Sequence, residues 1–417
     1  MDSACKLVYH GKRVEKKIKL IIINEKNESL KNIHIKPLKQ TIHLSAMDYG
    51  RGNLMAEKML QYLEEQPAVW NRILENRSQL FQPLEKKFFE RKIKRVVLVG
   101  SGSSYNASLL AAQFYQEMLG LEAQAEVPAR IGTLPPLLDP ETTLIFAVSQ
   151  SGLSISTIQA IHLFRKLGFT VAGFTADESS PVAGACDVHQ LIDCGDEFIG
   201  PKTKGMTASV LTLYLAGMRL CSVTGRLNCE KEATVCSKFL RSFAAAPQNI
   251  ARCKEFCKAN LRNLSEQPFY TIISDGTGYA AACEGALKIL ETLCVPAYSY
   301  EFEEYLHGIN NLIAPGICNL FVPVNPANFQ WMWKLDDYCR ANGCSDFVIT
   351  SAPDSGFTNA LELEGSGCAC TQPFETLLLF QIFSVLGSEY KGMNCDKSKF
   401  PNFCSLMETK AVRRPVH

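Results

Sequence analysis

Apolar runs alternate with segments of helical periodicity over most of this chain. The run Thr143-Leu144-Ile145-Phe146-Ala147-Val148 is apolar at nearly every position, which is typical of a parallel strand covered on both faces. Residues 158–168 show helical periodicity and end in Lys and Gly. This order predicts a buried strand, a turn and then a helix.

The same alternation predicts further α/β units in both halves of the chain. The predicted strands span 96–100, 143–148, 171–175, 270–274, 320–324 and 347–350. The predicted helices run from the turn at 101–104 to about Leu119, over 207–221, and through Glu284 to Leu293. Because strands and helices alternate, we expect an α/β fold with doubly wound parallel sheets, and the halves look like a duplication.

The chain divides into four predicted regions. Residues 1–46 form a basic N-terminal extension, and residues 47–90 form a helical segment that Gln66-Pro67 breaks once. The first α/β domain, expected to bind phosphate, spans 91–240. The second spans 241–417 and includes a C-terminal tail that belongs to the active site.

The N-terminal extension differs in charge from the rest of the chain. It holds ten Lys or Arg against four Asp or Glu. Alternating stretches such as Lys17-Ile18-Lys19-Leu20 favour a short hairpin, with disorder as the other expectation. We hypothesise that the extension lies outside the functional body and that translation naturally begins at Met47, Met55 or Met59.

Composition narrows the class of protein. Of 417 residues, 47% are hydrophobic and 20% are charged, as in a soluble globular protein. A net charge of +1 gives no reason to expect a nucleic-acid partner. The apolar stretch 376–383 is too short to span a bilayer, and no secretory signal is expected. We therefore expect a cytoplasmic protein without a membrane partner.

The 17 cysteines are spread along the chain without a C-x-x-C pair. Cys253 and Cys257 lie one helical turn apart, and Cys368 and Cys370 flank one residue, but neither pair has the second half of a tetrahedral metal site nearby. We expect buried thiols in a reducing compartment, with no metal and no cofactor.

A cluster of hydroxyl side chains follows the strand at 143–148. Five of the nine residues 149–157 are Ser or Thr, on a predicted strand-to-helix turn. Free backbone N–H groups and the positive end of the helix dipole favour a phosphate at such a turn. An ordinary Ser-rich helix cap is the alternative interpretation.

A second turn, Gly100-Ser101-Gly102-Ser103-Ser104-Tyr105, also follows a strand and opens a helix. A dinucleotide-binding turn would place a third glycine where Tyr105 stands, so that interpretation is set aside. In a doubly wound sheet, Ser103 and Ser104 would instead approach the same crevice as the serine turn.

Several segments resemble the SIS, or sugar isomerase, domain family, in the double-SIS arrangement of the isomerase half of glucosamine-6-phosphate synthase and of fructosamine-6-phosphate deglycases. They are the helical segment at 62–67, the turns at 101–106 and 149–152, the E-G-A-L-K-x-x-E helix at 284–291 and the E-x-x-H-G segment at 304–308. The resemblance covers about Met55 to the C-terminus. It implies two tandem SIS domains, each a flavodoxin-like three-layer α/β/α fold. The substrate-binding residues it implies are Ser103, Ser104, Ser149, Gln150, Ser151, Ser154 and Lys288.

The helix at 284–291 carries the expected chemistry. Glu284, Lys288 and Glu291 fall at i, i+4 and i+7, which places them on one face. Aldose–ketose interconversion needs one base that removes a proton and returns it on the same face, and Glu291 is that expected base. Lys288 is expected to orient Glu284 or to bind a sugar oxygen. A surface ion-pair stripe is the alternative.

The resemblance assigns two further catalytic residues, His307 and Lys410. His307 lies 16 residues beyond Glu291, the separation that the family shows between its base and its ring-opening histidine. In the family this histidine reaches the site of the neighbouring subunit, which implies a homodimer with shared active sites. Lys410 corresponds to a C-terminal lysine that assists ring opening.

The sequence departs from the family in four places. Ile309 and Ser398 stand where the family has proline. Gly200-Pro201-Lys202 replaces small residues in a segment that closes the phosphate turn. Lys410 comes several residues later than the family's lysine.

A phosphorylated sugar is the expected substrate. The leading hypothesis is isomerase-type chemistry on a 6-phosphorylated amino sugar or fructosamine, with deglycation, deamination or isomerisation as the net reaction. Residues 1–46 cannot supply a glutaminase domain, so ammonia transfer from glutamine is not expected. The alternative is a non-catalytic sugar-phosphate sensor that regulates a partner.

Overall fold

The computed structural model describes residues 57–88, 92–133, 137–352, 355–357 and 360–412. All of them belong to one compact unit, residues 53–417. The predicted extension at 1–46, with its hairpin, lies outside the described residues.

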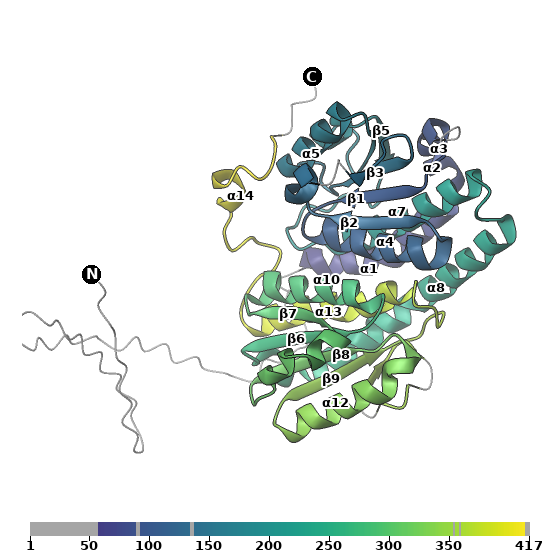
Figure 1. The fold of residues 1–417 in the computed structure, drawn as a ribbon. Helices are drawn as coiled ribbons and strands as arrows, with labels where there is room; N and C mark the ends of the chain where they lie inside the picture. The colour runs from purple at the N-terminus through teal and green to yellow at the C-terminus, as the bar shows by residue number, and fades with distance from the viewer. Residues whose placement is uncertain (1–56, 89–91, 134–136, 353–354, 358–359, 413–417) are drawn as a thin grey trace, which may run out of the picture. The chain divides into compact units, whose positions relative to one another are not determined.

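The first half contains a five-stranded parallel sheet (Figure 1). Its strands, in spatial order, are β2 (Glu122–Glu126), β1 (Arg95–Val99), β3 (Thr143–Val148), β4 (Thr170–Thr175) and β5 (Val188–Leu191). The strand predicted at 143–148 is confirmed with the same first and last residues, and it is buried at every position, as its apolar run predicts.

The second half repeats the arrangement. Its parallel sheet has the order β7 (Ala297–Glu301), β6 (Phe269–Ser274), β8 (Ile317–Val322), β9 (Ser345–Thr350) and β10 (Ala360–Glu362). Matched strand by strand, this order is the same as that of the first sheet. The predicted α/β class with two parallel sheets is confirmed.

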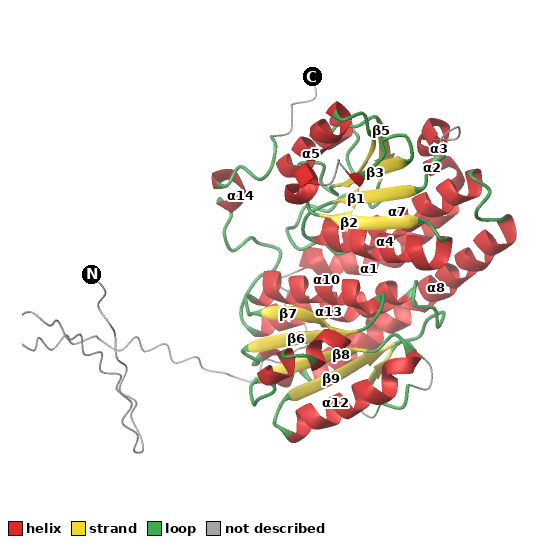
Figure 2. Cartoon of the chain, viewed as in Figure 1, coloured by secondary structure: helices red, strands yellow, loops and turns green. Residues whose placement is uncertain are grey.

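Helices flank both sheets (Figure 2). Those of the first half are α1 (Glu57–Glu75), α2 (Arg77–Leu80), α3 (Gln82–Phe88), α4 (Ser103–Leu119), α5 (Ile155–Lys166), α6 (Pro181–Ala185) and α7 (Lys204–Val223). They are followed by α8 (Cys229–Ala259), α9 (Leu261–Ser265), α10 (Gly278–Leu293), α11 (Phe302–Leu306), α12 (Phe329–Ala341), α13 (Gln372–Tyr390) and α14 (Phe403–Leu406).

The helix break predicted at Gln66-Pro67 is wrong, because α1 continues through Pro67. Proline removes the N–H that would bond the carbonyl four residues earlier, here that of Leu63. The Gln66 side chain replaces that bond: its Nε2 donates to Leu63 O at 3.2 Å and to Gln381 Oε1 at 2.7 Å. A buried amide thus satisfies the carbonyl that proline leaves unpaired.

The 31-residue helix α8 crosses position 240, where the boundary between the two domains was predicted. Its packing against α13 and α1 ties the halves together, and α4 and α10 also pack against each other. One helix of the described residues, α7, is long and apolar enough to cross a membrane by composition, but 83% of that window is buried inside the structure. Burial of this kind is what a core helix shows.

Candidate functional site

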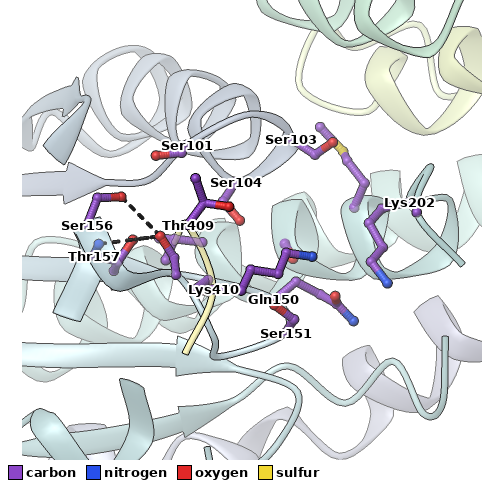
Figure 3. A pocket seen from close by; sticks show the side chains of 16 residues that line it. Ser101, Ser103, Ser104, Gln150, Ser151, Ser156, Thr157, Lys202, Thr409 and Lys410 are labelled. Carbon is purple, nitrogen blue, oxygen red and sulfur yellow. Dashed lines mark hydrogen bonds between the residues drawn. The ribbon is translucent and has the colours of Figure 1, made fainter. Parts of the chain in front are cut away.

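A cavity of about 380 Å³ lies where β1 and β3 end (Figure 3). Adjacent parallel strands bring their carboxyl ends to one sheet edge, so the two Ser-rich turns meet there. Seven of the predicted site residues line the cavity: Ser103, Ser104, Ser149, Gln150, Ser151, Ser154 and Lys410. Additional polar lining comes from Ser101, Ser156, Thr157, Lys202, Ser209 and Thr409.

The serine turn caps a helix and lines the cavity. Ser154 caps α5, since its Oγ accepts hydrogen bonds from Thr157 N at 3.3 Å and Thr157 Oγ1 at 2.9 Å. Gly152 has a φ of +69°, and a Cβ there would lie 2.1 Å from Ser180 Oγ. Glycine is therefore required for the turn to bring its hydroxyls and the α5 N-terminus to the cavity.

The turn before α4 connects the cavity to the second half. Ser103 Oγ donates to Glu284 Oε1 at 2.9 Å, and Asn106 Nδ2 donates to Glu284 Oε2 at 2.7 Å. Ser103 therefore lines the cavity, but its hydroxyl proton is already directed at a carboxylate. Gly102 begins α4 without a side-chain cap, which leaves backbone N–H groups as donors.

Lys288 holds two carboxylates together on α10. Its Nζ lies 3.3 Å from Glu284 Oε1 and 2.5 Å from Glu291 Oε2. The Lys288 and Glu284 side chains are completely buried and Glu291 is 33% exposed, so the surface-stripe interpretation is wrong. Burial raises the pKa of Glu284, against the lowering effect of Lys288. Lys288 is not among the residues that line the cavity, and its ion pair with Glu284 fits the expectation that it orients that carboxylate.

Glu291 and His307 stand apart from the cavity in this chain. His307 follows α11, its side chain is 70% exposed, and its Nε2 lies 3.4 Å from Glu303 Oε1. Despite Ile309, the turn after His307 closes as a short 3₁₀ helix, Ile309–Leu312, and Gly308 adopts a φ of +116°. His307 therefore lies on the surface of the described part of the chain.

The C-terminal tail brings Lys410 to the cavity. Lys410 pairs with Ser154 in an antiparallel bridge. Ile155 N donates to Thr409 O at 3.2 Å, and Ala411 N donates to Leu153 O at 2.8 Å. Figure 3 shows Thr409 and Lys410 among the lining side chains. The tail therefore closes the cavity as a short strand along the serine turn.

Asp396 anchors the beginning of this tail. Its carboxylate accepts hydrogen bonds from Lys58 N and Met59 N, both at 3.0 Å, and so stabilises the first turn of α1. Asp396 thus has a structural role at the beginning of the tail.

Lys202 is a lining residue that the sequence did not identify. Its Nζ donates to Glu197 O at 2.7 Å. Burial lowers the pKa of Lys202, and the positive charge of Lys410 acts in the same direction. The sequence feature that could have pointed to Lys202 is the unusual Gly200-Pro201-Lys202 triplet just before the buried helix α7. The cavity therefore receives two lysines from segments far apart in the sequence.

The corresponding position in the second half is filled by a carboxylate. Asp275 follows β6 as the first turn follows β1, and it is 1% exposed. Its oxygens accept hydrogen bonds from Val324 N at 2.9 Å and from Asn328 Nδ2 at 2.8 Å. These donors come from the loop after β8, the counterpart of the serine turn.

Comparisons with known proteins agree with this geometry. The SIS domain family model matches residues 91–219. The glutamine–fructose-6-phosphate aminotransferase of Pseudomonas putida is 27% identical over 334 residues, which cover 76% of this chain and 54% of that protein. The chain thus spans about half of the length of the curated relatives it matches.

Two solved structures show the same fold across both halves. The C-terminal domain of glucosamine-fructose-6-phosphate aminotransferase from Francisella tularensis has a TM-score of 0.74 at 21% identity, covering 85% of this chain and 99% of that one. Glucosamine-6-phosphate deaminase from Thermotoga maritima has a TM-score of 0.64 at 19% identity, covering 82% and 97%. Residues 91–219 therefore match the SIS domain family, most of the chain shares the fold of these two structures, and its sequence is similar to those of glutamine–fructose-6-phosphate aminotransferases.

Proposed function

We propose that this protein is an enzyme that carries out aldose–ketose isomerase-type chemistry on a 6-phosphorylated amino sugar or fructosamine. The carrying observation is the cavity, in which a serine turn, a helix N-terminus and Lys410 converge. The relatives' names, which refer to fructose 6-phosphate and glucosamine 6-phosphate, support the same substrate class.

The cavity is suited to a phosphate monoester. The α5 N-terminus supplies the positive end of a helix dipole, and Ser149 and Ser151 add hydroxyl donors. Lys410 adds a positive charge from the C-terminal tail, which lies along the serine turn. A volume of about 380 Å³ falls within the range of small-molecule sites.

Glu291 is the proposed base. One of its oxygens is fixed by Lys288 at 2.5 Å, and its 33% exposure leaves the carboxylate reachable. In this proposal Glu291 removes a proton from one carbon of the open-chain sugar and returns it to the neighbouring carbon. Water would then add to the resulting imine, and the carbinolamine so formed would expel ammonia or an amine and leave the carbonyl.

His307 is the proposed ring-opening group, acting in the site of a second copy. Its 70% exposure leaves the imidazole available to a partner subunit, and a neutral imidazole both accepts and donates protons near pH 7. We also propose a reducing, cytoplasmic setting, because the cysteines of the described residues are free thiols.

The test is a product assay with fructosamine 6-phosphates and glucosamine 6-phosphate, measuring released ammonia, amine and hexose phosphate. Glu291→Gln should lower kcat by at least about a thousandfold while binding of the phosphosugar is retained. Glu255→Gln, an exposed carboxylate on α8, is the matched control and should keep full activity. Full turnover by Glu291→Gln would refute the assignment.

A sugar-phosphate sensor is the second candidate. It is favoured by one observation: the cavity is built from the first half and the tail, without Glu291 or His307. A sensor would bind the phosphosugar yet form no product even with enzyme in excess, and Glu291→Gln would then bind as the wild type does. Product formation by the wild type excludes it.

A further inference from the structure

Cys368 and Cys370 form a close pair of thiols away from the cavity. Their Sγ atoms lie 3.1 Å apart in the loop that precedes α13. Cys368 is partly exposed, whereas Cys370 is 5% exposed. The Cys368 thiol is therefore accessible to solvent, whereas the Cys370 thiol beside it is buried.

Lys238 of α8 favours the thiolate of Cys368. Its Nζ lies 3.7 Å from Cys368 Sγ. The hydrogen bond with Cys370 and, to a lesser degree, Lys238 lower the pKa of Cys368 to about 5. The same hydrogen bond, together with burial, raises the pKa of Cys370. A low-pKa, accessible thiol beside a second thiol is the arrangement of redox-active cysteines.

The loop keeps both thiols in place. Cys368 N donates to Ser366 Oγ at 3.1 Å, and Thr371 Oγ1 donates to Cys368 O at 3.0 Å. Thr371 Oγ1 also lies 3.1 Å from Glu375 Oε1, on the first turn of α13. Because side-chain bonds fix the loop at both ends, the two sulfur atoms meet without rearrangement of α13.

The other close-spaced pair behaves differently. Cys253 and Cys257 lie inside α8 and are completely buried. Burial raises the pKa of both thiols, that of Cys257 to about 12. Both remain protonated and out of reach of solvent, so this pair is an internal control for reactivity.

We propose that Cys368 and Cys370 are a reversible dithiol–disulfide site that reacts with low-molecular-weight disulfides. The Cys368 thiolate attacks one sulfur of the small disulfide, forming a mixed disulfide and releasing one small thiolate. Cys370 loses its proton and attacks the Cys368 sulfur, which forms the intramolecular disulfide and releases the second small thiol. The two cysteines are oxidised by two electrons, and the small disulfide is reduced to two thiols.

The test treats the purified full-length chain with oxidised glutathione at pH 7, followed by alkylation under denaturing conditions. Glutamyl endopeptidase cleavage after Glu364 and Glu375 releases residues 365–375, which hold these two cysteines and no other. We expect this fragment to lose two hydrogens, to carry no alkyl group and to recover both thiols with dithiothreitol. Cys253 and Cys257 should be alkylated in the same sample. A doubly alkylated 365–375 fragment would overturn the proposal.

Variants separate the two roles. In Cys370→Ser, Cys368 should stop as the mixed disulfide with glutathione, and an unmodified Cys368 there would contradict its role as the attacking thiol. Lys238→Met should slow the first step about twofold at pH 6 and much less at pH 9, because only the thiolate attacks. Lys231→Met, an exposed lysine at the start of the same helix, should change neither rate. Equal slowing at both pH values would show that Lys238 has no electrostatic role.

Discussion

Glu284 is a residue of the second half whose polar contacts reach the first half. It is completely buried, and it accepts from Ser103 and Asn106 of α4 while it pairs with Lys288 of its own helix. Such a position joins the rim of the cavity to the carboxylate that we propose as the base. Glu284 thus contacts both Ser103, which lines the cavity, and Lys288, which pairs with Glu291.

Glu284→Gln should destabilise the protein by about 3 kcal/mol, because Lys288 remains buried with one of its two charged partners removed. Urea unfolding followed by circular dichroism measures the change. The exposed Glu255→Gln variant should stay within about 0.5 kcal/mol of the wild type. A loss below about 1 kcal/mol would contradict a tightly coupled cluster.

Asp346 gives a pH dependence of known sign. It is 4% exposed, and Asn319 Nδ2 donates to its Oδ1 at 2.7 Å. Burial raises its pKa from 3.8 to about 7. The native state therefore holds this proton between pH 4 and about 7 while the unfolded chain has lost it, so the contribution to stability falls as pH rises through that window.

Asp346→Asn should remove this fall. Between pH 5 and pH 8 the stability of the variant relative to the wild type should increase by up to about 3 kcal/mol. Denaturant titrations at the two pH values measure the difference, with the exposed neighbour Asp337→Asn as control. An equal effect of Asp346→Asn at both pH values would count against a buried, titrating Asp346.

At the scale of elements, α5 combines a structural cap with the proposed phosphate site. Ser154→Ala should cost about 1 kcal/mol of stability through the lost cap and should also weaken binding of inorganic phosphate. Asn228→Ala is the matched control, since Asn228 caps α8 by accepting from Lys231 N at 2.8 Å. Calorimetry with both variants decides. If both weaken phosphate binding equally, Ser154 acts only through stability.

Buried strands and their turns could be predicted from the sequence because burial on both faces gives continuous apolar runs. β2 could not, since its sequence Glu122-Ala123-Gln124-Ala125-Glu126 belongs to an edge strand with polar and small residues. The prediction of a helix break at Pro67 was wrong for another reason. Local rules cannot see a buried glutamine whose amide replaces the missing backbone donor.

The site shows the same division. Its serine turns follow strands and could be found in the sequence, whereas Lys202 depends on how the segment before α7 folds against the cavity. The spacing placed Lys288 on the correct helix face, but only the packed structure shows that its ammonium group pairs with both Glu284 and Glu291. Sequence spacing gives the face of a helix, but it does not say what lies opposite.

At the scale of the whole molecule, the proposed shared site predicts complementation. Glu291→Gln and His307→Ala should each be inactive. After subunit exchange, an equal mixture should regain about a quarter of wild-type activity, because half of the dimers are mixed and each holds one complete site. Either variant mixed with itself should regain none. Failure of the mixture, with dimers verified by analytical ultracentrifugation, would place both residues in one chain's site.

The carboxylate of Asp275 has a consequence for how an anion meets this protein. The second sheet repeats the order of the first, yet Asp275 already accepts from the backbone that would otherwise face a ligand. In the second half these backbone donors are therefore already bonded to Asp275, whereas the serine turn of the first half lines an open cavity. Under the proposed function the two halves therefore have different tasks: the first binds the phosphate, and the second supplies Glu291 on α10.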